Sequence, residues 1–544
     1  MNTLAFILCF LFQYEPPKEA LQFVTTEKLK QHIAVLSHDS LEGRGPSSRG
    51  DKKATAYIVS QMKQFGLLPA GENGGYLQKI PLVGMLVNPS AKFVFSKGKN
   101  SQTLNYSDDF VALPGAHEPV INVKNIPVVF VGYGIVAPEQ RNWDDYKGVD
   151  VSGKILLMMN DDPNNGDPNF FAGKGRTYYG RWTYKYEIAA AKGALGAIVI
   201  HTTRSAGYPY RVIQNSFSAE SFDVDEKNSA PKLRIKAWTT EEATRKYVEL
   251  AGYNLDSLFA MAQSPAFKPV DLNIQLSVSM QSTVRRLETN NIIGKVEGSD
   301  PVLKNQYIVF SAHYDHFGIG RAIDGDSIYN GALDNASGTS LMLNLAETFA
   351  SMNEKPKRSL LFAAVAAEEQ GLLGSQYFAN NPTVPIQSIA ANINTDVMNV
   401  TGRTTDISFQ GDNRSSLGND IAVVAKEMGL TVMPDRAPEQ GGFYRSDHFS
   451  FAKAGVPAIS VGGGSNVVGV DTTILKKIRT DFGKSYHQPS DEMKDYWIYD
   501  GGIQEAEFII RLVWRIGNIV EMPYWNPGDE FEAVRKASLK KVKR

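Results

Sequence analysis

The sequence has almost no cysteine: Cys9 is the single one among 544 residues. It lies within a short apolar run that extends from Leu4 to Phe12. If this segment is removed after export, no thiolate remains in the protein. Any metal ion that the protein binds must then be held by histidine and carboxylate groups.

The sequence also lacks a charge of one predominant sign. It has 57 basic and 58 acidic residues, which gives a formal net charge of −1. Binding of nucleic acid depends on a clear excess of positive charge, at least over one region of the protein. We therefore expect no nucleic-acid partner.

Long apolar runs are missing as well, so we expect no stable membrane span. The run from Leu4 to Phe12 is too short to cross a bilayer but suits the hydrophobic part of a signal peptide. We expect residues 1–17 to be a signal segment and the protein to be periplasmic or secreted. Lipidation of Cys9, which would anchor the protein to a membrane, is an alternative that the large side chain of Leu8 disfavours.

The length exceeds what one hydrophobic core usually organises, so at least two domains are expected. Helical periodicity near the N-terminus gives way to strand-like segments at about residue 122, and strands alternate with helices from about residue 290. This alternation predicts an α/β domain with a mostly parallel central sheet flanked by helices. The expected parts are an N-terminal part, a strand-rich insertion, the α/β part and a solvated basic tail, at residues 18–121, 122–278, 279–525 and 526–544.

Histidine and carboxylate side chains follow several of the predicted strands. They are His313, Asp315 and His316 after strand 307–311, Glu368 and Glu369 after strand 359–366, Asp396 after strand 390–394, Asp334 before a helix that starts at Ser337, and His487 in a late loop. The carboxyl ends of parallel strands meet at one edge of a sheet, where ligands usually bind. Adjacent carboxylates there are costly unless a cation neutralises them. The set therefore favours a divalent metal such as zinc.

Each of these residues also has an explanation without a metal. Asp334 could cap the following helix, and Glu368 with Glu369 could favour a helix start through the macrodipole. Most histidines that follow a strand are hydrogen-bonded or exposed, and His316 is expected to be one of these. The shared sheet edge, and not any single residue, favours the metal site.

Five short strings, in chain order, resemble the successive motifs of the M28 zinc exopeptidases. They are His313-Tyr-Asp315, Asp334-Asn-Ala-Ser-Gly338, Glu368-Glu369, Asn394-Thr-Asp396 and Tyr486-His-Gln-Pro-Ser-Asp491. The stretch from Leu36 to Gly71 resembles the start of bacterial members, and residues 122–278 resemble the protease-associated (PA) domain. The resemblance implies the zinc exopeptidase fold with a smaller β-rich insertion that partly covers the mouth of the site.

The resemblance also implies a role for each motif residue at two zinc ions per chain. Asp334 would bridge the ions, His313 and Asp396 would complete one shell, and Glu369 and His487 would complete the other. Glu368 would act as general base, Asp315 would orient His313, and Tyr486 would donate to the oxyanion.

The function that follows is hydrolysis of N-terminal residues from peptide substrates, and the sequence carries no signal of oligomeric state. Arg445, Asp447 and His448 would lie along the substrate pocket. Ser446, Asp447 and His448 are triad residue types, but contiguous triad members do not have the geometry of serine hydrolases. Alternatives are a carboxypeptidase or dipeptidase that uses Arg445 to bind the substrate carboxylate, a non-catalytic receptor-like protein, and a single-zinc glutaminyl cyclase. The complete ligand set disfavours the last two.

Overall fold

The computed structural model describes residues 15–163, 166–226 and 231–540. The first 14 residues of the expected signal segment, Cys9 among them, lie outside the described residues. Across the described ranges, no helix is both long and apolar enough to cross a membrane. The chain forms two compact units. The second unit contains Pro81–Leu287 and Arg436–Tyr444, and the first unit contains the other described residues.

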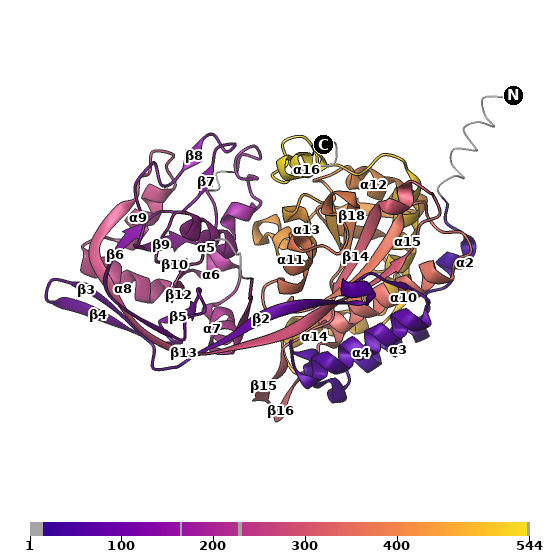
Figure 1. Cartoon of the computed structure of the whole chain (residues 1–544), viewed down its shortest axis with the longest axis horizontal. Helices are drawn as coiled ribbons and strands as arrows, with labels where there is room; N and C mark the ends of the chain where they lie inside the picture. The colour runs from indigo at the N-terminus through magenta and orange to yellow at the C-terminus, as the bar shows by residue number, and fades with distance from the viewer. Residues whose placement is uncertain (1–14, 164–165, 227–230, 541–544) are drawn as a thin grey trace. The chain divides into compact units, whose positions relative to one another are not determined.

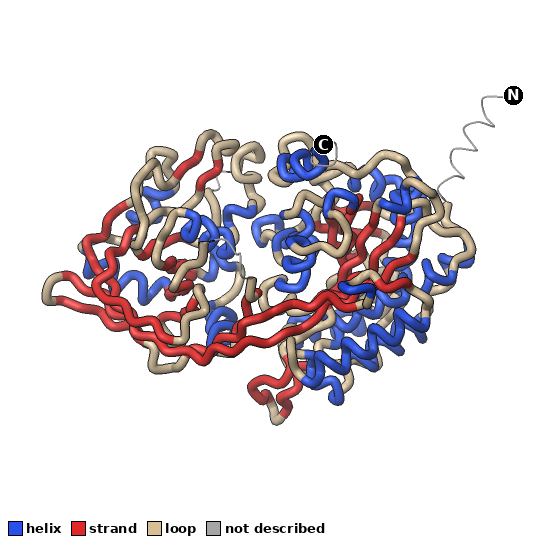
Figure 2. Tube along the Cα trace, viewed as in Figure 1, coloured by secondary structure: helices blue, strands red, loops and turns tan. Residues whose placement is uncertain are grey.

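The first unit is built on a mixed sheet, whose strands are red in Figure 2. Its four central strands are parallel. Its order is β1-β13-β17-β14-β18-β21-β19-β20, with β13 and β19 antiparallel to their central neighbours. The bounds are β1 Leu68–Pro69, β13 Val270–Val296, β14 Tyr307–His313, β17 Ser359–Val365, β18 Ile389–Thr395, β19 Asp406–Gln410, β20 Thr431–Met433 and β21 Ala458–Gly463. A separate hairpin pairs β15 (Gly318–Ile323) with β16 (Asp326–Tyr329).

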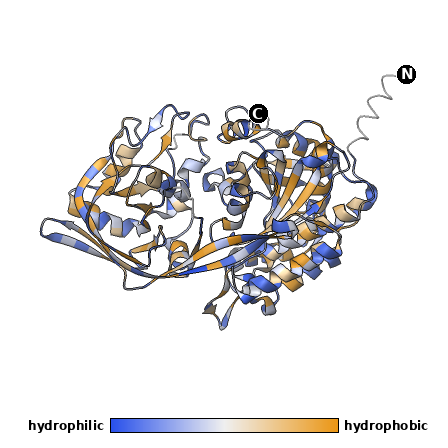
Figure 3. Cartoon of the chain, viewed as in Figure 1, coloured by the Kyte–Doolittle hydropathy of each residue, from blue (hydrophilic) through white to orange (hydrophobic). Residues whose placement is uncertain are grey.

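Helices cover this sheet because its central strands are apolar on both faces. All residues of β17 and β18 are buried, as expected for parallel strands between helical layers, and Figure 3 shows the hydrophobic colouring of this region. Helix α10 packs against β14, β17 and β18, while α13 packs against β18 and β21. The helices are α2 Lys18–Leu21, α3 Thr26–Leu36, α4 Arg49–Gln64, α10 Gly338–Ser351, α11 Leu373–Asn380, α12 Leu417–Glu427, α13 His448–Lys453, α14 Thr472–Ser485, α15 Asp500–Asn518 and α16 Glu532–Lys540.

Two N-terminal helices pack on the outside of α10 (Figure 1). Helix α3 begins where the side chain of Thr25 accepts a hydrogen bond from the amide of Lys28, and α4 begins where Ser48 caps the amide of Asp51 in the same way. The tight turn Asp39–Arg44 connects them. This segment carries Arg44 to the loops that follow β14, as described below.

The second unit has its own sheet, in the order β4-β3-β13-β6-β9-β10-β12-β5. The four strands β6, β9, β10 and β12 are parallel, and the remaining pairs are antiparallel. The strand bounds are β2 Leu77–Val87, β3 Lys92–Lys97, β4 Asn100–Asn105, β5 Phe110–Pro114, β6 Val120–Phe130, β7 Val136–Ala137, β8 Trp143–Asp144, β9 Ile155–Met159, β10 Gly196–His201, β11 Ser221–Val224 and β12 Ile235–Thr240. The helices are α5 Trp182–Ala191, α6 Thr203–Ala206, α7 Tyr210–Ser218, α8 Glu241–Ala251 and α9 Leu255–Ala262.

The second unit is larger than the insertion expected at residues 122–278. Strands β3 and β5, which lie before residue 122, pair in register with β13 and β12. These backbone hydrogen bonds place residues 81–121 with the insertion and not with the N-terminal part of the first unit. The chain enters the second unit within β2 and leaves it within the 27-residue strand β13.

The solvated basic tail expected at residues 526–544 is partly buried at residues 531–540. Helix α16 forms there, Phe531 and Arg535 are buried, and the Arg535 guanidinium donates a hydrogen bond to the Ile389 carbonyl at 2.8 Å. Burial of one aromatic ring and one guanidinium fixes a segment whose overall composition is that of a polar surface helix. Residues 541–544 lie outside the described residues.

Candidate metal centre

Three parallel strands of the first unit bring their carboxyl ends together at the candidate site. His313 is the last residue of β14 and lies opposite Val365, the last residue of β17. Asp396 follows the last residue of β18, which also pairs with β14. The predicted strands therefore place the predicted residues at one edge of the sheet.

Asp334 approaches this edge from the turn Ala332–Ser337, directly before α10. The turn starts at Gly331, where an added Cβ would lie 2.5 Å from the His316 ring and 2.4 Å from the Asp334 carbonyl oxygen. Only glycine fits this close approach, which also requires a positive φ of 55°. Asn335 then links the turn to the loop after β18, since its side chain donates to the Thr395 carbonyl and accepts from the Val397 amide, both at 3.0 Å.

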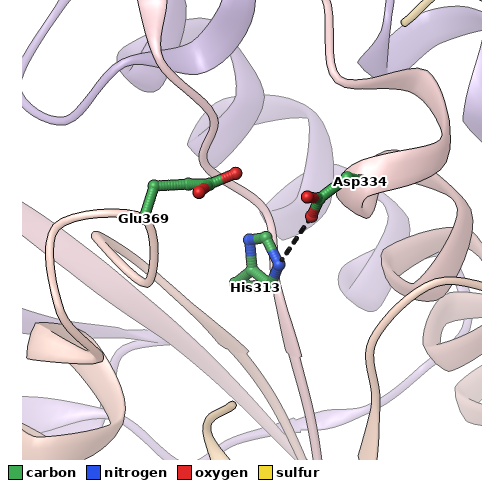
Figure 4. A group of neighbouring side chains, drawn as sticks. All are labelled: His313, Asp334 and Glu369. Carbon is green, nitrogen blue, oxygen red and sulfur yellow. Dashed lines mark ion pairs between the residues drawn. The ribbon is translucent and has the colours of Figure 1, made fainter. Parts of the chain in front are cut away.

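Glu368 and Glu369 follow β17 in a short loop, and their side chains have different neighbours. A Glu368 oxygen lies 4.0 Å from His313 Nε2. One Glu369 oxygen lies 2.6 Å from His316 Nδ1, and the other lies 3.3 Å from His487 Nε2. Figure 4 shows the side chains of Asp334 and Glu369 reaching toward each other from separate loops, with the His313 ring beside them.

The distances among the ligand atoms form two triangles that share Asp334. His313 Nε2 lies 3.3 Å from Asp334 Oδ1 and 3.4 Å from Asp396 Oδ1. His487 Nε2 lies 3.3 Å from Asp334 Oδ2 and 3.3 Å from Glu369 Oε2. A tetrahedron with metal–ligand bonds of about 2.0–2.1 Å has edges of about 3.3–3.4 Å, whereas direct hydrogen bonds between nitrogen and oxygen are mostly shorter, about 2.7–3.2 Å. The donor set and its spacing therefore fit two metal ions bridged by the two oxygens of Asp334.

Two further groups of these side chains are compact enough to hold a metal ion. The ligand atoms of His313, Asp334 and Glu369 lie within 4.8 Å of one another, as do those of His313, Glu368 and Asp396. His313 is thus common to both groups. Glu368 lies 4.0 Å from His313 Nε2, farther than Asp334 and Asp396 at 3.3 and 3.4 Å, which fits a base that is not itself a ligand.

The electrostatics of the site call for added positive charge. Four carboxylates, those of Asp334, Glu368, Glu369 and Asp396, have only histidines as ion-pair partners within 4 Å among the described residues. Burial and the neighbouring carboxylates hold the pKa values of Glu368 and Glu369 well above the usual range. Burial would raise the pKa of Asp334 too, but His313 and His487 hold it well below its usual range. Divalent cations at this point would stabilise all four groups as carboxylates.

Three further groups hold the candidate ligands in place. Asp315, the predicted partner of His313, has a carboxylate oxygen 3.8 Å from His313 Nδ1, and it accepts a hydrogen bond from the Glu368 amide at 3.1 Å. The ring of His316 contacts Glu369, and burial lowers the pKa of His316 to about 4. Asp491 accepts from the amides of Leu333 and Asp334, each at 3.0 Å. The sequence predicts no metal-site role for His316, and it identifies Asp491 only as the last residue of one motif.

Arg44 is a fourth such group, and sequence reasoning missed it altogether. Its side chain is fully buried and donates to the carbonyls of Tyr314, Asn330 and Gly331 at 2.6, 2.6 and 2.9 Å, and also to that of Leu36. The flanking glycine Gly43 comes so close that an added Cβ would lie 2.3 Å from the Tyr329 carbonyl oxygen. The string Gly43-Arg-Gly45 was a usable signal, because an arginine between glycines suits a close approach of two backbones.

The remaining predicted residues surround the same sheet edge. Tyr486 is half-exposed and stacks on the His487 ring at a centroid distance of 3.8 Å. Asp447 and His448 are buried at the start of α13, while Arg445 is partly exposed. Burial raises the pKa of Asp447 to about 7. The neighbouring Ser446 accepts a hydrogen bond from Asn394 of β18 at 2.8 Å, which ties this loop to the strand that precedes Asp396.

A family comparison agrees with this geometry. Residues 291–513 match the model of peptidase family M28. This part of the chain belongs to peptidase family M28. This match confirms the expected family, and the parallel strands between helices confirm the expected α/β fold. The M28 region contains all five residues of the two triangles.

Individual relatives support the same family. A probable zinc metalloprotease of Pyrenophora tritici-repentis is 32% identical over 204 residues (31% of this chain, 44% of the relative). Leupeptin-inactivating enzyme 1 of Streptomyces exfoliatus is 26% identical over 247 residues (44% and 51%). A glutamate carboxypeptidase 2 homolog of Caenorhabditis elegans is 28% identical over 500 residues (81% and 60%). The chain thus spans about half the length of these curated relatives.

A solved structure shows the fold shared by more of the chain. The aminopeptidase from Aneurinibacillus sp. strain AM-1 is 20% identical with a TM-score of 0.52, over 93% of this chain and 97% of that one. At this identity the likeness concerns the fold alone. The sheet order and the helical layers of the M28 region are therefore those of a known architecture.

Proposed function

We propose that this protein is a two-metal exopeptidase that releases N-terminal residues from peptides. The observation that carries the proposal is a pair of ligand triangles that share the two oxygens of Asp334, in each of which the histidine nitrogen lies 3.3–3.4 Å from two carboxylate oxygens. His313 and Asp396 would hold one zinc ion, Glu369 and His487 the other, and Asp334 both. Two such ions, when bound, would supply the acid chemistry that generates a hydroxide from water at neutral pH and polarises a peptide carbonyl.

Glu368 is the group best placed to move a proton. It lies beside His313 and Asp396 but at the longer distance of 4.0 Å from His313 Nε2, and burial raises its pKa. A carboxylate with a raised pKa accepts a proton from water and can pass it to the leaving nitrogen. The Glu368 amide is held by Asp315, so the loop that carries the base is fixed to the loop that carries His313.

The N-terminal preference rests on the charge of the site. Among the described residues, no lysine or arginine lies within 4 Å of the surrounding carboxylates, so no cationic side chain lies beside them to bind the C-terminal carboxylate of a peptide. Tyr486, half-exposed beside His487, would donate a hydrogen bond to the carbonyl oxygen as charge develops there.

A carboxypeptidase or dipeptidase is the second candidate, and Arg445 is the observation that favours it. Arg445 precedes Ser446, which is hydrogen-bonded to Asn394 near the carboxyl end of β18. A substrate carboxylate could reach this guanidinium. An aminoacyl-anilide and an N-blocked dipeptide separate the two candidates: the first proposal predicts turnover of the anilide alone, and turnover of the blocked dipeptide alone would replace it with the second.

Glu368→Gln tests the proton transfer. We expect this variant to retain its metal content and lose activity by at least a thousandfold, which corresponds to about 4 kcal/mol of transition-state stabilisation. Glu354→Gln, a change at an exposed glutamate of the same unit, is the matched control and should leave turnover unchanged. Turnover by Glu368→Gln close to that of the unaltered protein would exclude the proposed role.

A further inference from the structure

The second unit has a cavity in the same topological position as the metal centre of the first. Its four parallel strands β6, β9, β10 and β12 lie side by side (Figure 1). The chain after each strand contributes at least one wall residue, and the first of these are Tyr133, Asn160, Thr202 and Glu241. The cavity they line has a volume of about 290 Å³. The carboxyl edge of a parallel sheet is where α/β units bind their ligands.

One wall of this cavity presents a hydrogen-bond acceptor without a partner. Asn160 is 4% exposed, its amide nitrogen donates to the Ser205 carbonyl at 3.1 Å, and its Oδ1 has no hydrogen-bond partner. Buried acceptors without a donor are uncommon in folded proteins because they lose their hydration. The next residue, Asp161, has a φ of +95°, a backbone conformation that is uncommon for residues other than glycine. The acceptor without a partner indicates that a ligand's N–H group belongs here.

The charges along the cavity are paired, with one exception. Arg245 holds the carboxylates of Glu241 and Asp256 at 2.6 and 2.7 Å, and Arg176 lies 3.3 Å from Asp161. Arg204, on α6, has no carboxylate within 4 Å among the residues that the structure describes, and its side chain is exposed at the cavity wall. The cavity therefore offers one guanidinium for an anionic group.

The rest of the lining is apolar or aromatic. Met159 and Ile200 come from the ends of β9 and β10, and Phe259 comes from α9. A volume of 290 Å³ lies at the lower limit for small-molecule sites, which are about 300–1,000 Å³. The ligand must therefore be small and combine a donor, an anion and an apolar group.

We propose that this cavity binds a free α-amino acid with an apolar side chain. The ammonium group would donate to Asn160 Oδ1 beside Asp161, the carboxylate would pair with Arg204, and the side chain would pack against Met159, Ile200 and Phe259. The site is built from the second unit alone, so it does not depend on the metal centre or on the proposed peptidase activity. If that activity holds, the ligand belongs to the class of molecules that the enzyme releases.

Calorimetric titration of the full chain with L-leucine and L-phenylalanine tests the proposal. We expect saturable binding at one site that persists after the metal has been removed with a chelator, since binding at the metal centre would be lost. L-leucinamide lacks the carboxylate and N-acetyl-L-leucine lacks the ammonium, so each should bind at least tenfold more weakly. The proposal would be overturned if either analogue bound as tightly as L-leucine, if binding required the metal, or if no saturable binding occurred.

Two variants assign the binding to this cavity. Arg204→Ala should weaken L-leucine binding at least tenfold, whereas Arg211→Ala, at an exposed arginine of α7 in the same unit, should leave it unchanged. Asn160→Leu removes the acceptor and should also weaken binding at least tenfold. Because Arg204 is exposed, its variant folds even if the change at buried Asn160 does not. Unchanged affinity in Arg204→Ala would contradict the assignment.

Discussion

Each unit has acidic residues near the carboxyl edge of its own parallel strands, but the two units neutralise these residues in different ways. In the first unit, the carboxylates of Asp334, Glu369 and Asp396 face only histidines. In the second unit, the fully buried Lys185 donates to the Asp161 carbonyl at 2.8 Å and attracts the carboxylates of Asp145 and Asp162, while Arg176 pairs with Asp161. In the second unit, lysine and arginine side chains supply the positive charge that metal ions would supply in the first unit.

Another buried acidic residue of the first unit has neither a metal site nor a lysine or arginine beside it among the described residues. Glu505 of α15 is buried and accepts one hydrogen bond, from the Asn399 amide at 2.9 Å. Burial raises its pKa to about 8, so it is protonated at neutral pH. A buried acid thus keeps its charge only where a cation accompanies it. Carboxylates that lack a protein cation and yet gather at a sheet edge are therefore the ones that indicate a metal.

Metal removal should have the largest effect and should act on one unit only. Dialysis against a chelator is expected to lower peptidase activity by at least a thousandfold, because the nucleophile and the carbonyl polarisation are both lost. Zinc addition should restore it. The response of the second unit is the control: limited proteolysis within residues 81–287 should not change on metal removal. Activity that survives complete removal would show that the carboxylates serve another purpose.

Lys185→Met should have the next largest effect, and on stability. It leaves Asp162 and Asp145 buried without their cation, which we expect to cost roughly 3–5 kcal/mol. The thermal unfolding midpoint of the second unit measures it. Adding Asp162→Asn should recover part of the loss, and Lys174→Met, at an exposed lysine of this unit, should have no effect. A stable Lys185→Met protein with an unaltered midpoint would break the comparison between the units.

Two buried arginines of the first unit allow a smaller and sharper test. Arg44 and Arg358 are both fully buried, donate to several backbone carbonyls, and have pKa values that burial lowers to about 10. Only Arg44 contacts the loops that carry His313 and Asp334. We expect Arg44→Met to lower zinc affinity about tenfold in a competition with a chromogenic chelator, which is about 1.4 kcal/mol.

Arg358→Met is the matched control for this change. It removes the same charge and a similar number of hydrogen bonds, but its carbonyl partners lie at the end of α15 and in the chain after it, at Ile516, Ile519, Val520 and Glu521. The variant should lose stability without losing zinc affinity. Equal zinc affinity in the two variants would show that Arg44 does not support the metal centre.

The smallest effect is expected at Glu505 and depends on pH. The pKa of Glu505 is about 8 in the folded chain against 4.5 for the ordinary group, so between these values the unfolded chain binds fewer protons. Stability should therefore fall as the pH rises through this window, by roughly 2–4 kcal/mol. Glu505→Gln should flatten this dependence of the unfolding midpoint. Glu507→Gln, two residues along the same helix and paired with Arg403, should retain it.

The sequence predicts those parts of the first unit that depend on local patterns. The strands before His313, Glu368 and Asp396 are short apolar runs, and each ends within a residue or two of its predicted end. The five candidate ligands follow because parallel strands share an edge.

Features that depend on distant contacts do not follow from the sequence in this way. Arg44 lies 270 residues before Tyr314, one of its hydrogen-bond partners, and no local pattern connects the two. Helix α14 was not predicted, although Ile474, Ile478 and Phe482 follow helical spacing and Asp471 caps its first turn by accepting from the amides of Thr473 and Ile474. Of these apolar residues the structure buries Ile478 alone. The predicted bounds of the insertion are too narrow because one strand, β13, belongs to both units. It pairs with β17 in the first unit and with β3 and β6 in the second.

The metal content of the full chain tests the central claim most directly. Elemental analysis of the zinc-saturated protein, after removal of free metal, should give two ions per chain, and Asp334→Ala should give fewer than one because it removes the shared ligand of both triangles. One ion or none in the unaltered protein, or two ions retained by Asp334→Ala, would contradict the account.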